Sequence, residues 1–518
     1  HYSSSMIDDA RLKEKRLDWQ RGYKVQAGYA GLGWNLGGLG YITKNRNVYP
    51  HAYYLVFPGG SARLTKKDGD EWETHPKLFA KIRHRINNHY NYHDTNHWEI
   101  ITKDGTHYIF GEQINTDGRP ENWENTYVGG TRQFVNNSAT SLIAINNVDH
   151  TASQLEPNKW SLSRIFDTNA NEIKFYYEQE VREWRGGHAN PYYTKAILPY
   201  YIEYGRNAQN KYQYKIEFSY QDNREDYQVP GWDADYQQSF WTSRLLKEIK
   251  VLANNQLLRK YILTHEYTPE VANVNGSDQH AILKKIEHRG RGGQAGLPAY
   301  TFTYDSLNHL GGGDYVMGDI YLLTANNGYG GKVSYDYDWL DSVTYSNRDN
   351  EGHRCDQTTT RARLKKKTIE DGRGNSHTET YGYAGPPIAY VQEGATYFDG
   401  EGEYKGFEFL GHQQVEVKLS EKNQPEQIAS RNRSFFHRYL EADGCFRVDP
   451  RRGRPLKKET LSAGGNVLTK TEIQYGVEIE GQVFESPACA DIPGATIEEE
   501  RAAQLFVFNR RTDNFLTD

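Results

Sequence analysis

The sequence predicts an all-β protein, in which a series of hairpins forms one large coiling antiparallel sheet with very little helix. Apolar and polar residues alternate with a period of two along most of the 518 residues, which is the pattern of strands that bury one face. Gly, Asn and Asp cluster between the alternating runs, where hairpin turns require them. Aromatic residues make up 13% of the chain, a content that disordered chains lack.

The alternating runs follow one another as predicted strands. In Tyr212–Tyr220 every second residue is aromatic or aliphatic, so these side chains share one sheet face. Residues 98–111 hold two alternating runs around Lys103-Asp104-Gly105, and Asp-Gly supplies the positive φ of a hairpin turn. These runs predict meandering hairpins. The same plan of strand, polar turn and strand recurs in residues 160–178, 245–267 and 282–305.

Helical signal is confined to the ends of the chain. Residues 8–20 have the spacing of an amphipathic helix capped by Asp8 or Asp9. A second helix is expected over residues 495–508, begun by the capping-box spacing of Thr496 and Glu499. The Asn- and Gly-rich stretch Glu112–Pro157 is expected to be a long loop or an insertion.

A degenerate repeat underlies the hairpins. Each unit runs from a Gly- or Asn-rich turn into an alternating strand that ends in aromatic residues, whose rings are expected to stack on those of the next unit. One such hairpin is marginally stable in water, so the pattern has to recur. The units are residues 166–177, 327–337, 371–383 and 462–475, and the structural repeat aromatics are Tyr304, Tyr335, Tyr337, Tyr381, Tyr383 and Tyr475.

Composition and the chain ends narrow the classes of partner. The net charge of -6 provides no uniform positive field, so nucleic acid is not expected as a partner. No run approaches the ~20 apolar residues of a membrane span, and the first residues lack the apolar core of a signal peptide.

Because the chain begins at His1 and ends without a capping element, we interpret it as a processed product or a segment of a longer protein. The cysteines, whose redox state stays open, predict neither a disulfide framework nor a metal site: Cys355, Cys445 and Cys489.

A histidine-rich stretch around residues 84–97 is the main metal candidate. His89, His93 and His97 are spaced four apart, so on a helix they would share one face, as zinc ligands do. The surrounding Asn and Tyr residues form helices poorly. On a strand, residues four apart lie ~13 Å from each other, too far to share an ion. The sequence therefore favours a solvated loop over a metal site.

Motifs for cofactors and catalysis are absent or incomplete. The glycines of Gly28–Gly37 do not have the G-x-G-x-x-G order, and the residues after them alternate like a strand. Neither G-x-S-x-G nor H-E-x-x-H occurs, so no cofactor and no enzymatic activity are expected. Asp233 and Asp235 lie beside Trp232 and Trp241, which are the residue types of a glycosidase site. Coincidence in a chain rich in acids and rings accounts for them better.

Several blocks of the chain, in their order, resemble the RHS or YD-repeat proteins. They are similar to the pre-repeat and early-repeat segment of the B component of ABC (Tc) insecticidal toxins and of virulence-plasmid toxin B proteins. The YD dipeptide occurs at Tyr304-Asp305, Tyr335-Asp336 and Tyr337-Asp338, and Gly28–Lys44 resembles the Gly-rich opening strand of that family. Further blocks in the same order are residues 97–111, 160–178, 240–251, 297–305, 404–417, 435–440 and 451–468.

The resemblance implies a shell. In that family a spiralling sheet forms a hollow cocoon around a toxic C-terminal polypeptide. It implies as partners the remaining RHS repeats, a C-terminal effector of the same or a companion polypeptide, and a translocation component. It also implies that the protein is secreted or lies at the cell surface. The β-propeller that many toxin B components carry has no counterpart after residues 297–305, so a propeller-based docking surface is not expected here.

Two functions from different classes follow from the sequence. The first is a non-catalytic structural shell segment that encloses a toxic or effector polypeptide. The alternative is a secreted glycan-binding or glycan-cleaving β protein, whose many Tyr and Trp rings would stack on sugars. The expected domains are an N-terminal segment, 1–27, with the helix expected above; a pre-repeat region, 28–310; repeat strands, 311–475; and a C-terminal segment, 476–518, expected to be partly helical.

Overall fold

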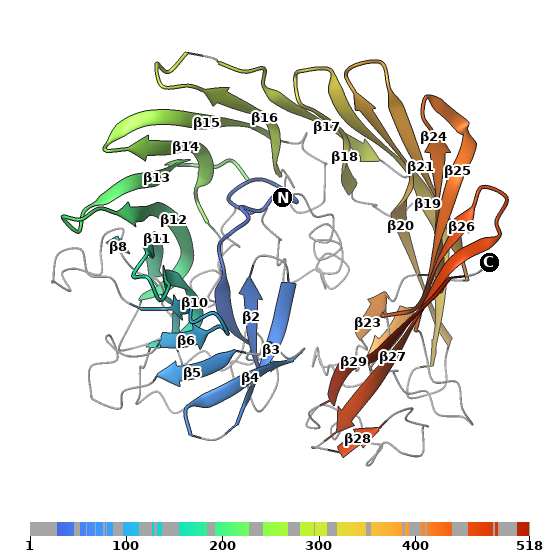
Figure 1. The fold of residues 1–518 in the computed structure, drawn as a ribbon, viewed down its shortest axis with the longest axis horizontal. Coiled ribbons are helices and arrows are strands. Elements are labelled where there is room, and N and C mark those ends of the chain that lie inside the picture. Colours follow the sequence, from blue (N-terminus) through green and yellow to red (C-terminus); the bar gives the residue numbers. More distant parts are fainter. Residues whose placement is uncertain are drawn as a thin grey trace. The chain divides into compact units, whose positions relative to one another are not determined.

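The computed structural model is all-β, as the sequence predicts, and its strands pair antiparallel (Figure 1). No helix occurs among the described residues, so none of them forms a helix that could cross a membrane. The structure describes residues 28–45, 52–57, 60–67, 69–75, 78, 80–85, 97–112, 127–128, 132–136, 155–183, 192–226, 242–267, 280–294, 296–307, 319–348, 354–385, 389–392, 406–409, 412–437, 454–479, 482–484 and 505–516.

The chain divides into two compact units, residues 1–322 and 323–518, and β18 (Asp319–Asn326) includes the division. The strands of unit 1 before β18 are β1 (Tyr41–Asn45), β2 (Ala52–Phe57), β3 (Gly60–Lys66), β4 (Glu71–His75), β5 (Lys81–Arg85), β6 (His97–Ile101), β7 (His107–Phe110), β8 (Tyr127–Val128), β9 (Arg132–Asn136), β10 (Leu155–Phe166), β11 (Glu172–Glu183), β12 (Tyr192–Arg206), β13 (Tyr212–Gln221), β14 (Leu245–Ala253), β15 (Gln256–Tyr267), β16 (Ala281–Arg289) and β17 (Tyr300–Leu307).

The main hydrophobic core of unit 1 lies where the short strands β1–β7 pack against β10–β12. Trp98 on β6 and Trp160 on β10 are almost completely buried there, together with Ile42, Leu55 and Phe175. Burying a large ring removes more apolar surface from water than any other side chain can, so these tryptophans contribute most to holding the two groups of strands together.

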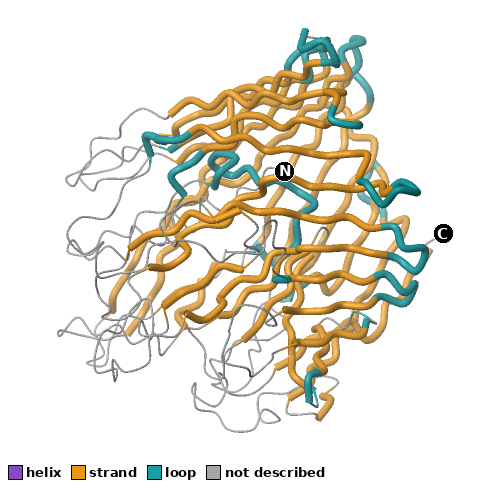
Figure 2. Tube along the Cα trace, turned by 90° about the vertical axis from the view of Figure 1, so that its left-hand side faces the viewer, coloured by secondary structure: helices purple, strands orange, loops and turns teal. Residues whose placement is uncertain are grey.

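Strands β10–β17 form a meander in which tight turns alternate with longer connections. Tight turns join β10 to β11, β12 to β13 and β14 to β15, and the longer stretch 290–299 joins β16 to β17, so antiparallel pairing places these four connections at one edge of the sheet. Figure 2 shows the described turns at the strand ends. In the first turn Asp167 accepts hydrogen bonds from the backbone amides of Asn169 and Asn171, both at 2.9 Å. Ala170 follows with a φ of 63°.

Unit 2 continues the same plan with longer strands. β19 pairs with β20, β20 with β21, β21 with β24, and the order continues through β25 and β26 to β27, which also pairs with β29. The strands are β19 (Gly331–Arg348), β20 (Arg354–Asp371), β21 (Ser376–Ala384), β22 (Ala389–Gln392), β23 (Gly406–Phe409), β24 (Gln414–Glu421), β25 (Gln424–Phe436), β26 (Pro455–Ser462), β27 (Val467–Ile479), β28 (Gln482–Phe484) and β29 (Leu505–Leu516).

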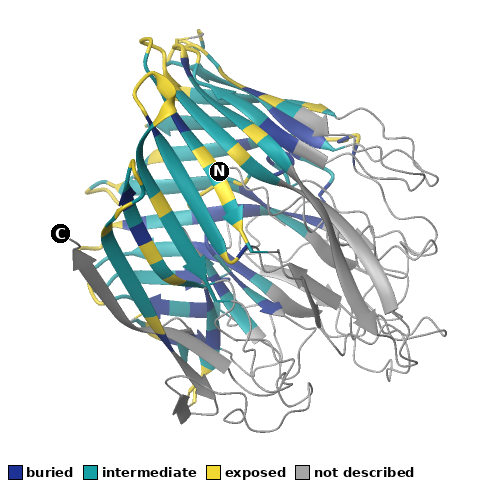
Figure 3. Cartoon of the chain, turned by 90° about the vertical axis from the view of Figure 1, so that its right-hand side faces the viewer, coloured by how far each residue is buried: buried dark blue, intermediate teal, exposed yellow. Residues whose placement is uncertain are grey.

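One face of unit 2 is a ladder of alternating charges. Glu416 on β24 faces Arg433 on β25, which faces Glu459 on β26. Arg433 lies 2.8 Å from Glu416 and 3.5 Å from Glu459, and both carboxylates are largely buried. Figure 3 shows intermediate burial along much of these strands. Cross-strand ion pairs therefore replace a continuous apolar core on this face.

Two predictions for the chain are wrong in part. Residues 505–508, expected at the end of a helix, belong to β29, because β29 pairs with β27 over eleven positions and pairing outweighs a local capping signal. The stretch Glu112–Pro157, expected to be a long loop or an insertion, is not a continuous loop, because it contains β8, β9 and the start of β10. The helix expected over residues 8–20 lies outside the described residues.

Candidate functional site

The feature that recurs most regularly in the structure is a β-bulge bridged by a tyrosine. In β20 the residue Lys365 is extra, because Asp336 on β19 faces Lys366 while the next residue, Tyr337, faces Leu364. A bulge interrupts the local ladder of backbone hydrogen bonds. Tyr383 on the following strand, β21, donates its hydroxyl to the Leu364 carbonyl at 2.6 Å. The tyrosine thus provides a partner to a carbonyl beside the bulge.

Within the described residues the same arrangement occurs five times, in both units. Each time the acceptor is the carbonyl of the residue just before the extra residue, and the tyrosine lies on the next strand in the sheet. The bonds are Tyr177 to Leu162 (2.8 Å), Tyr220 to Pro199 (2.6 Å), Tyr304 to Leu283 (2.6 Å), Tyr383 to Leu364 (2.6 Å) and Tyr475 to Pro455 (3.0 Å). The extra residues are Ser163, Tyr200, Lys284, Lys365 and Leu456.

In unit 1 these bulges lie at one level across the sheet. Tyr177, which bonds the first bulge, is the register partner of Pro199 at the second. Tyr220, which bonds the second, is the register partner of Leu246, beside a further bulge in β14. We call this line of positions the bulge row. Because a bulge bends its strand and increases the local twist, bulges aligned on alternate strands bend neighbouring strands at the same level.

His265 on β15 takes the place of a tyrosine in the bulge row. It is the register partner of Leu283 on β16, but it does not bond the strand before it. Its Nε2 instead contacts the carbonyl of Ala30 at 3.1 Å, in the Gly-rich opening segment. The bulge row of unit 1 therefore also receives a segment from far away in the sequence.

In unit 2 the bulge-bridging tyrosines Tyr383 and Tyr475 have cations and imidazoles beside their rings among the described residues, whereas the sequence predicts stacking on the rings of the next repeat. The Arg363 guanidinium lies 5.0 Å above the Tyr383 ring, and His412 lies 4.8 Å from it. Arg454 and His437 flank Tyr475 in the same way, at 5.7 Å each. Burial raises the pKa of the Tyr383 hydroxyl, so this group stays a protonated donor at neutral pH.

The predicted repeat aromatics occupy related but different places. Tyr304, Tyr383 and Tyr475 bridge bulges, whereas Tyr381 donates to Glu379 at 2.6 Å. Tyr337 is the register partner of Leu364. Tyr335 is the register partner of Lys367 on β20 and is half-buried.

Sequence reasoning missed two members of the set, Tyr177 and Tyr220. All five bridging tyrosines follow a hydrophobic residue by two positions, as in Phe218-Ser-Tyr220 and Ile473-Gln-Tyr475. All five also lie within about ten residues after a turn, near the end of an alternating run. This pattern is a signal that could have found them.

The histidine stretch does not form a metal site in the part of the chain that is described. His84, on β5, is buried and stacks on Trp98 at 4.0 Å. His97 begins β6, while His89 and His93 lie outside the described residues. No group of three His, Cys, Asp or Glu side chains among the described residues is placed to hold a metal ion. Asp233 and Asp235, with Trp232 and Trp241, also lie outside them.

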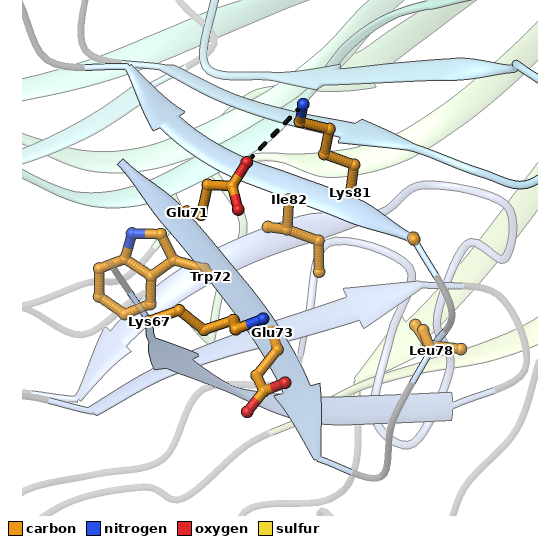
Figure 4. Close-up of a pocket in the computed structure, with 8 residues that line it drawn as sticks. Lys67, Glu71, Trp72, Glu73, Leu78, Lys81 and Ile82 are labelled. Atoms are coloured by element: carbon orange, nitrogen blue, oxygen red, sulfur yellow. Dashed lines mark ion pairs between the residues drawn. The ribbon is translucent and has the colours of Figure 1, made fainter. Parts of the chain in front are cut away.

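A shallow open hollow of about 300 Å³ lies beside Trp72 on β4 (Figure 4). The Glu71 carboxylate lies 3.7 Å from the Lys81 ammonium group and 3.9 Å from the Arg83 guanidinium. The Trp72 ring packs edge-on against Tyr53 and Trp98, so it belongs to the core of unit 1. The hollow offers one aromatic ring, whereas a sugar platform needs several.

Comparison with known proteins gives matches among solved structures. No known protein family matches the sequence, and no curated protein does. The structure is similar to the crystal structure of TcdB2-TccC3 (9% identity, TM-score 0.47, 96% of this chain and 42% of that chain) and to the Photorhabdus luminescens Tc holotoxin pore (10%, 0.48, 96% and 40%). It is also similar to the N-terminal domain of the effector protein SpvB from Salmonella typhimurium (11%, 0.31, 52% and 92%). The chain spans about two-fifths of the length of the Tc toxin chains.

Proposed function

We propose that this chain is a non-catalytic wall segment of an RHS/YD-repeat protein that encloses a toxic or effector polypeptide for delivery. The observation that carries the proposal is the set of bulges bridged by tyrosines. Bulges are the device by which a long antiparallel sheet is made to curve, and a wall must curve to enclose anything. The hydroxyl bonds keep each bend in place at little cost, because the carbonyl beside each bridged bulge receives a donor.

The alternative, a glycan-binding protein, makes a different use of the same rings. A sugar platform needs several coplanar rings exposed in one groove. Here the Tyr383 ring is covered by Arg363 on one side and contacts His412, and its hydroxyl is bonded within the sheet. This arrangement favours a structural role for the repeat tyrosines.

The partners follow from the same proposal. We propose the remaining RHS repeats and a C-terminal effector, in the same or a companion polypeptide, as the groups that complete and occupy the shell. A translocation component would receive it, and the protein would act after secretion or at the cell surface. These partners derive from the resemblance of the YD units and the Gly-rich opening segment to toxin B components.

Protection from proteolysis tests the enclosure. The complete gene product that contains this chain is treated with a broad-specificity protease under native conditions and after denaturation. Enclosure predicts an intact fragment outside the wall sequence that becomes susceptible only after denaturation. Digestion of all non-wall segments at the same rate in both states would contradict the proposal.

A pair of variants separates the wall from the sugar platform. Tyr381→Ala should cost about 3 kcal/mol, as truncation of a packed ring does, and Tyr381→Phe about 1 kcal/mol, since only a hydrogen bond is lost. Stability is measured by urea denaturation, and sugar binding by a glycan-array screen of the wild-type chain and of both variants. Unchanged stability of the Ala variant, together with lost sugar binding, would refute the wall and favour the platform.

A further inference from the structure

Residues Gly28–Trp34, which we call the strap, cross the strands of unit 1 along the bulge row. The backbone carbonyl of Tyr29 accepts a hydrogen bond from the amide of Leu246 on β14 at 2.7 Å. Leu32 donates its amide to the carbonyl of Ala281 on β16 at 2.7 Å. Residues 29, 30, 32 and 34 of the strap contact β14, β15, β16 and β17 in turn. Because neighbouring strands lie ~4.8 Å apart, the strap runs almost perpendicular to them.

The end of the strap reaches the last bulge of the row. Trp34 donates its indole Nε1–H to the hydroxyl of Tyr304 at 2.8 Å, and its ring packs 4.5 Å from Phe302. The same Tyr304 hydroxyl donates to Leu283. The strap is therefore joined to the hydrogen bonds that hold the wall, and its release would remove one partner from that tyrosine.

His265 lies under the middle of the strap. Since its Nε2 bonds a carbonyl, this nitrogen is a donor, and the neutral imidazole fills the role with Nδ1 unprotonated. Gly31 covers the ring so closely that a Cβ built there would lie 3.3 Å from His265 Cδ2, and its φ of 101° suits only glycine. Docking of the strap thus buries the imidazole.

The charged groups around His265 come from a neighbouring segment. Arg224 and Asp226, which follow β13, form a buried ion pair at 2.7 Å, and Asp226 also accepts the amide of Ala281 at 3.0 Å. Among the described residues, the strap and the neighbouring strands also carry the phenols Tyr29, Tyr267 and Tyr304, and the carboxylates Glu225 and Glu266 lie beside Tyr267 and His265. Burial lowers the pKa of His265, and Arg224 lowers it further, while the bond to Ala30 and the charge of Asp226 act in the opposite direction.

We propose that the strap is a proton-sensitive latch, docked across the bulge row while His265 is neutral and released when this imidazole takes up a proton. The inference concerns unit 1 alone and does not depend on what the wall encloses. A protonated ring under the docked strap would be a buried cation beside Arg224, whereas in the released state water solvates it.

The direction of the pH effect follows from linkage. The pKa of His265 is lower with the strap docked than the ~6.5 of an exposed histidine, so the released state binds the proton more tightly. Docking is therefore complete above about pH 6.5 and weakens as the pH falls toward the docked pKa. The population of released strap rises by up to about tenfold per pH unit across this window.

Hydrogen exchange of the full chain tests the latch. Exchange of peptides that contain the amides of Leu32 and Leu246 is followed from about pH 7.5 to about pH 5.5 and corrected for the intrinsic rate at each pH. We expect both amides to lose protection together below about pH 6.5. Amides of β24–β26 in unit 2 provide the internal reference, and their protection should not change over this range.

His265→Gln removes the proton site but retains a donor for Ala30, because the glutamine amide reaches a position close to that of Nε2. Its strap should stay protected at every pH. The matched control is His288→Gln on β16, where Nε2 is buried and has no hydrogen-bond partner among the described residues. This control should lose strap protection on acidification as the wild type does.

Chymotryptic cleavage after Tyr29, Leu32 and Trp34, relative to a free peptide of the same sequence, gives a second measurement on the wild type. Acceleration on acidification supports release. A His265→Gln strap that is already open at neutral pH also supports the latch if the wild type opens on acidification, since docking then depends on this side chain. The latch is overturned if wild-type protection and cleavage stay constant across the range, or if His265→Gln keeps the full pH dependence.

Discussion

Gly372 and Gly374 lie in one turn, between β20 and β21, and their replacement by alanine should have very different effects. Both have positive φ, 75° and 85°, so an alanine is strained at either position. A Cβ at Gly374 would meet nothing within 4 Å. A Cβ at Gly372 would lie 2.6 Å from the Tyr329 carbonyl oxygen and 2.7 Å from the carbonyl carbon of Gly330. The turn before β19 packs directly on this glycine.

The magnitudes follow from these distances. The left-handed backbone costs an alanine about 1 kcal/mol at each position. Contact distances between heavy atoms are ~3.5–4.0 Å, so at Gly372 the neighbouring backbone must move by about 1 Å. Overpacking of this kind costs about 1–3 kcal/mol more. Gly372→Ala should therefore destabilise by about 3 kcal/mol and Gly374→Ala by about 1 kcal/mol.

Native-state hydrogen exchange of β19–β21 is the suitable assay, because a chain with two units need not unfold in a single transition. A difference of about 2 kcal/mol corresponds to roughly a 30-fold difference between the two variants in local opening. Equal effects of the two substitutions would show that the turns do not pack on each other in solution, and the reasoning from Cβ distances would be refuted.

Three further predictions use substitutions elsewhere in the chain. Ala170→Gly should stabilise by about 0.5–1 kcal/mol, because alanine is held at a positive φ there; a lower urea midpoint would contradict it. Tyr383→Phe should cost about 1–2 kcal/mol, because the Leu364 carbonyl beside the bulge loses its donor. Tyr335→Phe should cost almost nothing in the same assay, because the Tyr335 hydroxyl has no partner among the described residues. Asp226→Asn should cost about 3–5 kcal/mol, because it removes the negative charge beside the buried Arg224. Asp222→Asn, where the side chain is 69% exposed, should cost less than about 1 kcal/mol. Thermal unfolding that shifts equally for both variants would refute the assignment.

The hairpins could be predicted from sequence because their determinants are local. Asp167 and Asp371 each bond amides two and four residues further on, so the turn chemistry is complete within five residues. The alternation of Tyr212–Tyr220 likewise fixes which residues share a face, whatever the partner strand.

The bulges could not be predicted in the same way. Lys365 is the extra residue in β20 because the pairing with β19 changes register at this position. Asp336 faces Lys366 on one side of it, and Tyr337 faces Leu364 on the other. No residue type marks such a position, since the extra residues in the five bridged bulges include serine, tyrosine, lysine and leucine. The role of a bridging tyrosine therefore stays hidden until its neighbouring strand is known.

The strap illustrates the other limit, that of sequence distance. Its Gly-rich sequence predicts an opening strand over Gly28–Lys44, but the structure has turns over residues 28–40 and a strand only from Tyr41. The partners that hold this segment lie 235 and 270 residues away, at His265 and Tyr304. The helix predicted over residues 495–508 was wrong at residues 505–508, where a local capping signal competed with the pairing of β29 and β27. In both places contacts between remote segments decide the structure.

The distance between the strap and its partners also has a consequence for synthesis. The bulge-bridging tyrosines reach back only 15 to 21 residues, so each bend can be closed as soon as the next strand has emerged. Trp34, by contrast, waits for Tyr304, 270 residues later. At ~5–20 residues per second a ribosome needs roughly 10–50 s to add them. Within unit 1, the first described segment to be translated is thus among the last to find its place, and throughout that interval its apolar side chains are available to chaperones.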